Sequence, residues 1–306
     1  MKNKFVQYIH INKESHNQRI DNFLFKNFKK IPKDLIYKKI RTGQFRINKK
    51  RKKPEYKLQK NDIIRIPPYI IHTIPKKIKK ININWNKKII YEDPYILIIN
   101  KPQGIAVHGG SGNNYGIIEI FRKIYPKTTF LELVHRIDKD TSGILILAKK
   151  KKILRILHQQ FRENKIKKKY LTLVHGNWNP IIKKISNKLL KIKKHKKKKT
   201  ILHNKGKIAT TYFTIKQNFK LATLLSVIPI TGRTHQIRAH LSYSGNPIIF
   251  DHKYGNPKLD KNIKITKKKK ILLHAESIFF KHPVSKKKKL ILAPLNMNFK
   301  KYLNIL

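Results

Sequence analysis

The sequence contains no cysteine, only 15 acidic residues among 306, and no long uninterrupted apolar segment. Without cysteine there is neither a disulfide nor a thiolate metal site, and the composition fits a reducing compartment such as the cytoplasm. No window reaches the ~18 uncharged apolar residues of a transmembrane helix. The N-terminus also lacks the apolar core of a signal peptide. These absences argue against a secreted protein and against an integral membrane protein.

The scarcity of acids makes the charge balance extreme. There are 73 lysines and arginines, for a formal net charge of +58. Such a balance predicts a polyanionic partner, and nucleic acid is the usual one. Lysine, isoleucine and asparagine are all abundant, as expected of an AT-rich genome, so runs such as Lys149–Lys152 and Lys286–Lys289 are interpreted first as solvated loops. No stretch has the aromatic face of a membrane-binding helix, and we expect no membrane partner.

The length predicts about two domains, and the first is small. Residues 1–16 are polar and form either a frayed tail or a short edge strand. Apolar residues then recur at helical spacing from Gln18 to Lys30. Pro32 opens a second helix, and Gly43 is well placed to end it. Short strands are expected at 44–48 and 63–66.

The second helix of this region carries the cations Lys38, Lys39 and Arg41. Together with the segments Gln18–Asp21 and Arg41–Asn48, this pattern resembles the αL-type RNA-binding domain first seen in a small-subunit ribosomal protein. We therefore predict an RNA-binding domain at 17–70 and a linker at 71–88. The alternative is a generic helical lobe whose lysines are only solvated.

The rest of the chain, 89–306, is predicted to be one catalytic domain. Strands are expected at 96–99, 169–174, 209–216, 221–229 and 271–280, and helices at 117–125, 151–164 and 232–245. A lysine-rich insert at 183–207 forms either two ragged strands or a loop. Strands dominate without strict β-α alternation, which favours an α+β fold with a mixed or antiparallel sheet. The glycine-rich loop at 104–112 lacks the signature of a nucleotide-binding loop, so no nucleotide cofactor is expected.

One polar loop stands out in this domain. The segment Leu133–Gly143 lies between two apolar runs and contains Asp138 and Asp140. Two carboxylates in one loop of a chain so poor in acids suggest a nucleophile or a general base. The alternative is a turn whose Asp and Ser side chains make only local backbone hydrogen bonds.

Five motifs in fixed order connect this loop to a known family. They are Asn100–Pro102 with Gly104, His135–Gly143, Lys169–Tyr170, Thr231–His240 and Leu272–Ala275. Together they resemble the RluA-type pseudouridine synthases over the whole chain, and segments such as Arg51–Leu58 favour one branch of that family. The resemblance implies isomerisation of uridine to pseudouridine in large-subunit ribosomal RNA. It implies no cofactor and no metal, and we expect a monomer.

The resemblance also assigns roles to residues. It implies that Asp138 is the catalytic carboxylate, which attacks carbon 6 of uracil, attacks the ribose anomeric carbon, or assists loss of the base. Arg233 matches the family arginine that pairs with this carboxylate. Tyr170 matches a family tyrosine that stacks on the uracil and that can take the ring proton. A strand tyrosine is more often core packing, but its place in the Lys-Tyr motif favours the functional role. Asp140 is expected to be a hydrogen-bonding brace of the loop.

A uridine in folded RNA must leave the stack to reach such a site. Arg136 matches the residue near the vacated space, with His135 as its helper; a phosphate contact or an ion pair with Asp138 are the alternatives. Leu272 or Leu273 is expected against the other face of the uracil. His235 and His240 do not share a helical face, so a metal site there is rejected.

The same sequence features are compatible with two other functions. One is a non-catalytic RNA-binding or ribosome-assembly protein on the same fold. Another is a synthase of this family that acts on transfer RNA or on other ribosomal uridines. A serine hydrolase is excluded because no Gly-x-Ser-x-Gly sequence is present.

Overall fold

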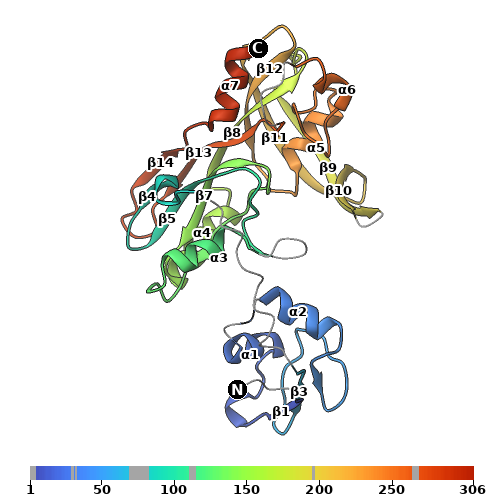
Figure 1. Ribbon diagram of the computed structural model, residues 1–306, viewed down its shortest axis with the longest axis vertical. Coiled ribbons are helices and arrows are strands. Elements are labelled where there is room, and N and C mark those ends of the chain that lie inside the picture. Colours follow the sequence, from blue (N-terminus) through green and yellow to red (C-terminus); the bar gives the residue numbers. More distant parts are fainter. Residues whose placement is uncertain are drawn as a thin grey trace. The chain divides into compact units, whose positions relative to one another are not determined.

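The computed structural model describes residues 5–28, 31, 33–68, 83–109, 115–194, 197–263 and 269–306. The chain divides into two compact units, Met1–Ile81 with Gly109–Asn114, and Asn82–His108 with Tyr115–Leu306 (Figure 1). Residues 71–82 of the expected linker lie outside the described residues. The expected end of the linker at residue 88 is corrected, because the Trp85 ring packs edge-on against Phe121 of the second unit with centroids 5.6 Å apart.

The small unit combines three strands with two helices. Its elements are β1 (Gln7–His10), the 3-10 helix η1 (Lys13–Ser15), α1 (Ile20–Asn27), α2 (Lys33–Arg41), β2 (Arg46–Ile47) and β3 (Ile63–Ile66). The strands form an antiparallel sheet in the order β1-β3-β2. The prediction that residues 1–16 form a tail outside this unit is therefore wrong for 7–11. Those residues supply an edge strand, which was the stated alternative, and the buried Ile11.

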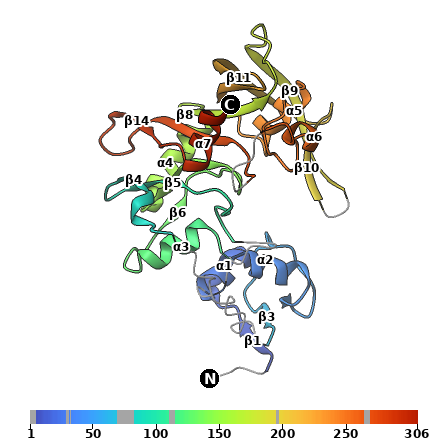
Figure 2. The ribbon, with the colours of Figure 1, turned by 45° about the horizontal axis from the view of Figure 1, so that its top comes forward.

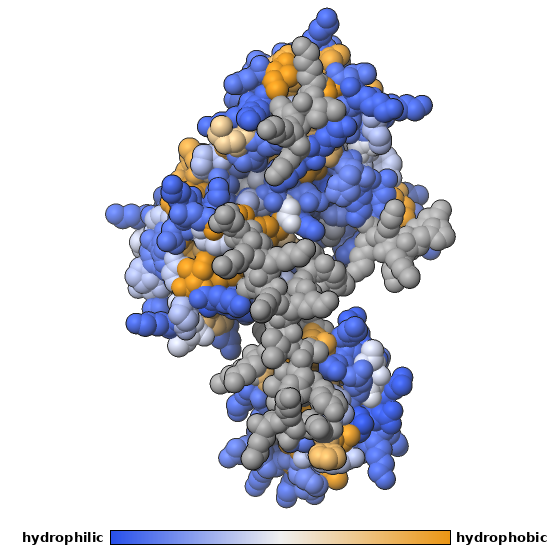
Figure 3. Space-filling view, in the orientation of Figure 1, coloured by the Kyte–Doolittle hydropathy of each residue, from blue (hydrophilic) through white to orange (hydrophobic). Residues whose placement is uncertain are grey.

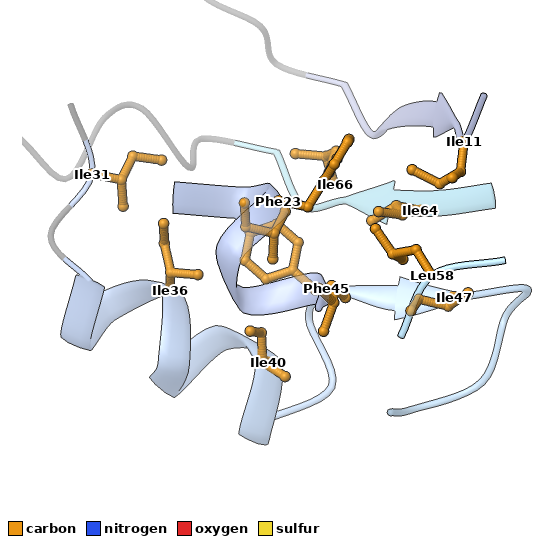
Figure 4. Close-up of a cluster of buried hydrophobic side chains, with 12 residues drawn as sticks. Ile11, Phe23, Ile31, Ile36, Ile40, Phe45, Ile47, Leu58, Ile64 and Ile66 are labelled. Atoms are coloured by element: carbon orange, nitrogen blue, oxygen red, sulfur yellow. The ribbon is translucent and has the colours of Figure 1, made fainter. Parts of the chain in front are cut away.

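The core of the small unit lies between its sheet and its helices. Figure 4 shows Phe23 of α1 at the centre of the labelled side chains, between Ile36 of α2 and Ile66 of β3. Phe45, which follows α2, closes the core and is buried. Helix α2 ends before Gly43, whose φ of 70° is the left-handed conformation that a glycine C′ residue adopts without strain. The cations of α2 therefore lie on a helix held by a packed core.

The second unit is built on one large sheet. Its strands are β4 (Ile89–Glu92), β5 (Ile96–Lys101), β6 (Glu132–Leu133), β7 (Ser142–Ala148), β8 (Lys167–His175), β9 (Lys184–Lys194), β10 (Lys197–Leu202), β11 (Lys207–Asn218), β12 (Ala222–Pro229), β13 (Leu273–Lys281) and β14 (Lys288–Leu292). The order is β10-β9-β11-β12-β8-β13-β7-β5-β4, with β14 on β13 and β6 on β7. Among the described strands, only β13 and β7 pair in parallel. The lysine-rich insert is thus a hairpin of two strands, and the α+β fold with a mixed sheet is confirmed.

The helices of this unit are the 3-10 helix η3 (Asn86–Lys88), α3 (Ile117–Ile124), α4 (Lys151–Arg162), α5 (Gln236–Tyr243), α6 (Pro257–Asp260) and α7 (Met297–Ile305). They cover both faces of the sheet. Alternate residues of β5 pack with α4 on one face and with α3 on the other. At β8 and β12, α7 covers one face and α5 the other (Figures 1 and 2). In the part of the chain that the structure describes, no helix is both long and apolar enough to span a membrane.

The visible surface is mostly hydrophilic, with small separate apolar patches (Figure 3). This is expected of a chain with 73 lysines and arginines. The apolar side chains are instead concentrated in the clusters that line the two faces of the large sheet. The apolar residues that pack the large sheet are therefore largely separate from the cationic residues that cover the surface.

Candidate active site

The loop that contains Asp138 connects β6 to β7. It is a tight turn, in which the backbone N–H of Thr141 donates to the carbonyl of Asp138 at 3.2 Å. The next carbonyl, that of Lys139, accepts from the backbone N–H of Gly104 and from Nζ of Lys101, both at 2.9 Å. The loop is thus fixed at the residue after Asp138 by the glycine-rich segment that follows β5.

Lys101 is the buried support of this loop. Its side chain is fully buried, and Nζ also donates to the carbonyls of Pro102 and Ile105 at 2.8 and 3.0 Å. Burial lowers the pKa of Lys101 to about 7, although the nearby charges of Asp140 and Asp138 favour the ammonium form. Lys101, the lysine of the Asn-Lys-Pro motif, therefore supports the loop by a hydrogen bond from the protein interior and does not face solvent. Asp140 itself lies 4.0 Å from Nε2 of His252.

The ion pair of Asp138 differs from the expected one. Nη1 of Arg238 donates to Oδ2 of Asp138 at 3.1 Å. Arg233 is exposed, and its Nε donates to the carbonyl of Ile208 at 3.1 Å. The predicted pairing of Arg233 with Asp138 is therefore wrong. The reason is the start of α5, which begins at Gln236 and not at residue 232, so Arg238 is the arginine that the first helical turn directs at the loop.

Arg238 is itself held rigidly by a second carboxylate. Its Nε and Nη2 each donate to Asp251 at 2.7 Å, a bidentate pair in which both side chains are almost fully buried. Burial opposes the charge of Arg238, but the hydrogen bonds and charge of Asp251, followed by Asp138, outweigh it and raise the arginine pKa. The pKa of Asp251 is lowered, since the Arg238 contacts outweigh its burial. The guanidinium is thus a permanent cation of fixed orientation.

His235 is the second basic group near Asp138. Its Nε2 lies 3.8 Å from Oδ2 of Asp138, and its Nδ1 is 2.8 Å from the hydroxyl of Tyr254. Burial lowers the pKa of His235 to about 4, despite the opposing effect of Asp138. The imidazole is therefore neutral near pH 7, which leaves Arg238 as the charged partner of Asp138.

A cavity of about 540 Å³ opens over this carboxylate. Its lining includes six of the residues that the sequence predicts for the site, namely His135, Arg136, Asp138, Tyr170, Arg233 and Leu273. Leu272 points away, into the core cluster with Phe299 of α7, so of the two leucines only Leu273 can contact a bound ring. The volume is within the usual range of small-molecule sites, and it admits a single nucleoside.

Two aromatic groups of the lining have different environments. Burial and then the charge of Asp138 raise the pKa of Tyr170, so its hydroxyl keeps its proton at neutral pH. His135 accepts a hydrogen bond through Nε2 from the backbone N–H of Ile146 at 3.1 Å and packs on Phe161 with centroids 5.3 Å apart. Burial, with Lys168 nearby, lowers the pKa of His135 to about 3. His135 is therefore anchored to the sheet, whereas Arg136 is exposed at the rim.

Several residues of the site escaped prediction. Arg238 and His235 lie within the motif Thr231–His240, but the sequence does not reveal where its helix begins. Asp251 carried a usable signal, because it is one of only 15 acids and follows the apolar run Ile248–Phe250. Among the described residues, no three His, Asp or Glu side chains gather as metal ligands would. The site consists of one carboxylate with a fixed counterion, an aromatic ring and an apolar wall.

The predicted cations of the small unit lie on α2. Lys38 and Arg41 are exposed, and Nζ of Lys39 donates to the side chain of Gln44 at 2.7 Å. Burial, and then the charge of Lys38, lower the pKa of Lys39. The last turn of α2 thus presents a compact cationic surface.

Comparison with known proteins shows which proteins this chain resembles in sequence and in fold. The family model described as RNA pseudouridylate synthase matches residues 95–243. The chain is 55% identical to ribosomal large subunit pseudouridine synthase C of Buchnera aphidicola subsp. Acyrthosiphon pisum over 98% of this chain and 97% of that protein. The enzyme of the same name from Haemophilus ducreyi is 45% identical, over 96% and 94%. The solved structure of human RNA pseudouridylate synthase domain containing 4 has the same fold, with a TM-score of 0.59 and 24% identity over 72% of this chain and 93% of that one.

Proposed function

This chain belongs to the family of RNA pseudouridylate synthases, which are isomerases, and we propose that it converts specific uridines of large-subunit ribosomal RNA to pseudouridine. The substrate class comes from the relatives, which are named for the large ribosomal subunit and match over nearly the whole chain. We place the reaction in the cytoplasm, where the RNA of bacterial ribosomes is found.

Asp138 is the catalytic carboxylate in this proposal. The observation that carries the assignment is its position. It lies at the wall of the cavity, its side chain is 25% exposed, and its counterion Arg238 is fixed from behind by Asp251. A carboxylate with an immobile counterion and an open side can approach a bound nucleoside. It can then attack carbon 6, attack the anomeric carbon, or assist departure of the base.

The rest of the cavity recognises the uracil. We assign Tyr170 to one face of the ring and Leu273 to the other, because both line the cavity together with Asp138. Stacking of a base on an aromatic side chain stabilises it by about 1–3 kcal/mol. Since the Tyr170 hydroxyl stays protonated, it can donate a proton or a hydrogen bond at neutral pH, and a role as base would require a change on substrate binding.

A target uridine must be extruded from its stack to enter this cavity. Arg136 is suited to fill the vacated space, since it is exposed at the rim, two residues from Asp138. His135 supports Arg136 through its anchored ring and does not itself enter the RNA. The small unit supplies affinity through phosphate contacts of Lys38, Lys39 and Arg41.

The function is tested by mapping pseudouridines in large-subunit RNA from cells with the gene, without it, and with the variant Asp138→Asn. We expect specific pseudouridines to disappear both without the gene and with Asp138→Asn, while RNA affinity of the purified variant changes less than about threefold because binding rests on phosphate contacts. Conversion by Asp138→Asn at a substantial rate would refute the role of Asp138. Sites lost only from transfer RNA, or none lost at all, would favour the alternatives of another substrate or of a non-catalytic RNA-binding protein.

A further inference from the structure

A chain of hydrogen bonds, buried at Ser142 and His274 and half-buried at Asn296, lies directly behind the Asp138 loop. It joins Ser142, the first residue of β7, to His274 of β13 and to Asn296, which precedes α7. Ser142 and His274 are almost completely buried. None of these three lines the cavity, so substrate contact does not account for them.

The direction of each bond can be deduced. Nε2 of His274 lies 3.1 Å from the carbonyl of Ala293, which can only accept, so Nε2 carries the proton. In a neutral imidazole Nδ1 is then an acceptor, and the Ser142 hydroxyl donates to it at 2.8 Å. Burial lowers the pKa of His274, which favours this neutral form.

Asn296 completes the chain. Its Oδ1 accepts from the backbone N–H of Phe299 at 2.9 Å and so caps α7, which fixes the orientation of the amide. Its Nδ2 therefore faces Ser142 and donates to the hydroxyl oxygen at 3.0 Å. The hydrogen bonds therefore run in one direction: Asn296 donates to Ser142, Ser142 donates to His274, and His274 donates to the carbonyl of Ala293.

The backbone explains why these groups meet. Ser142 and His274 are register partners where β7 and β13 pair in parallel, and Gly143 pairs with Ala275. Gly143 has a φ of 106°, and a Cβ at this position would lie only 2.2 Å from the carbonyl oxygen of Ala275. Glycine therefore permits the close approach of the two strands. The bond between Ser142 and His274 thus joins the end of the Asp138 turn to β13, in which Leu273, the residue before His274, lines the cavity.

We propose that Ser142, His274 and Asn296 are positioning residues, which fix the C-terminal end of the Asp138 loop and thereby place its carboxylate against the substrate. The inference rests on the proposed role of Asp138. Lys101 fixes the same loop closer to Asp138, at the carbonyl of Lys139. A carboxylate that must approach one atom of a bound nucleoside needs its short loop held at both of these points, because small displacements of a catalytic group are costly in rate.

The test uses two variants of the full-length chain. Asn296→Asp keeps the helix cap and the side-chain volume but removes the donor to Ser142, and the new carboxylate competes with His274 for the serine hydroxyl. Ser142→Ala removes the hydroxyl itself. Asn256→Asp is the matched control, because the Asn256 side chain also caps a helix, α6, where it accepts from the N–H of Lys258.

Turnover is measured as pseudouridine formed in large-subunit RNA transcripts, together with KM, the melting temperature and the activity of Asp138→Asn. We expect Asn296→Asp and Ser142→Ala each to lower kcat on the order of tenfold, with KM and melting temperature close to the parent and with the double variant no worse than the poorer single one. Asn256→Asp should match the parent. A kcat within twofold of the parent for both variants, or a loss of kcat explained by loss of folded protein, would overturn the proposal. Substantial activity of Asp138→Asn would instead refute the catalytic role of Asp138.

Discussion

Charge is used in opposite ways in the two units of this protein. In the small unit the buried carboxylates are saturated: Asp21 accepts from Arg19 and Tyr37, and Asp62 accepts from Asn48 and Tyr56. The cations of α2 are left at the surface. In the candidate active site of the larger unit it is the cation, Arg238, that is buried and paired with two carboxylates, and one of these, Asp138, is left with an open side.

This inversion separates binding from chemistry. In the proposed mechanism, the exposed cations of α2 contact phosphates whose positions vary, so they gain little from rigidity. The proposed catalytic carboxylate, Asp138, must meet one atom, so its counterion is fixed by a second acid that is assigned no part in the reaction. The comparison explains why Asp251, which lies outside the Asp138 loop, is fully buried and accepts two hydrogen bonds from Arg238.

The largest effect is expected from breaking the buried cation. Arg238→Gln leaves Asp138 without its counterion and Asp251 buried without its partner. We expect kcat to fall at least 100-fold and the free energy of unfolding to fall by about 3–5 kcal/mol, the usual cost of removing one member of a buried pair. Single-turnover rates at a temperature where circular dichroism shows the variant folded separate the two effects.

Arg233→Gln is the control for this prediction, since Arg233 carries the same charge in the same motif but is exposed. Its kcat should change less than about threefold. A severe loss with Arg233→Gln beside a mild one with Arg238→Gln would show that the arginine expected from the family resemblance, and not the one seen in contact, serves the carboxylate.

An intermediate effect is expected from the small unit. Replacing Lys38, Lys39 and Arg41 together by glutamine removes three surface cations. RNA affinity should fall about tenfold at moderate salt, and the slope of log affinity against log salt should decrease by about 2 to 3 if all three contact phosphates. Filter binding across a salt series measures both, and kcat at saturating RNA should be unchanged.

Lysine abundance makes a charge-matched control essential for that experiment. Lys281, Lys287 and Lys288 are exposed in the β13–β14 region of the larger unit. Replacing these three by glutamine changes the net charge equally. Equal losses of affinity and slope in the two triple variants would mean that α2 acts through general charge alone and is not a dedicated RNA-binding surface.

The sequence predicted much of the fold because periodicity was locally clear. Strand β3 was predicted with its observed bounds, and α3 and α4 to within two residues, because isoleucine and leucine recur at regular spacing there. Helix α7 and strand β14 were missed. In β14 two lysines precede only three consecutive apolar residues, and α7 buries only Phe299 and Tyr302, so neither segment has a distinctive pattern.

The site was predictable where a residue type was rare and not where geometry decided. Asp138 stood out because acids are scarce. The choice between Arg233 and Arg238 depends on the turn before α5. This turn ends at His235, whose φ of 53° is left-handed, so the helix begins at Gln236 and not at residue 232 as predicted. Leu272 likewise lies in the core and Leu273 in the cavity because of the register of β13 against β8, a strand about 100 residues earlier in the chain, in which Leu273 pairs with Thr172.

The smallest effect concerns His235, whose neutrality makes Arg238 the charged partner of Asp138. Its pKa is lowered to about 4 by burial, whereas an unfolded histidine titrates near 6.5. Between these values the unfolded chain binds more protons than the folded one, so stability rises with pH and is lost as pH falls from 6.5 toward 4. Asparagine at position 235 tolerates the left-handed backbone, and His235→Asn should reduce this slope by at most about 1.4 kcal/mol per pH unit.

Urea titrations at several pH values measure the slope, and His203→Asn, at an exposed turn, should leave it unchanged. An unaltered slope in His235→Asn would mean that folding does not lower the pKa of His235, and the imidazole would then become a second cationic partner of Asp138 below about pH 6.5.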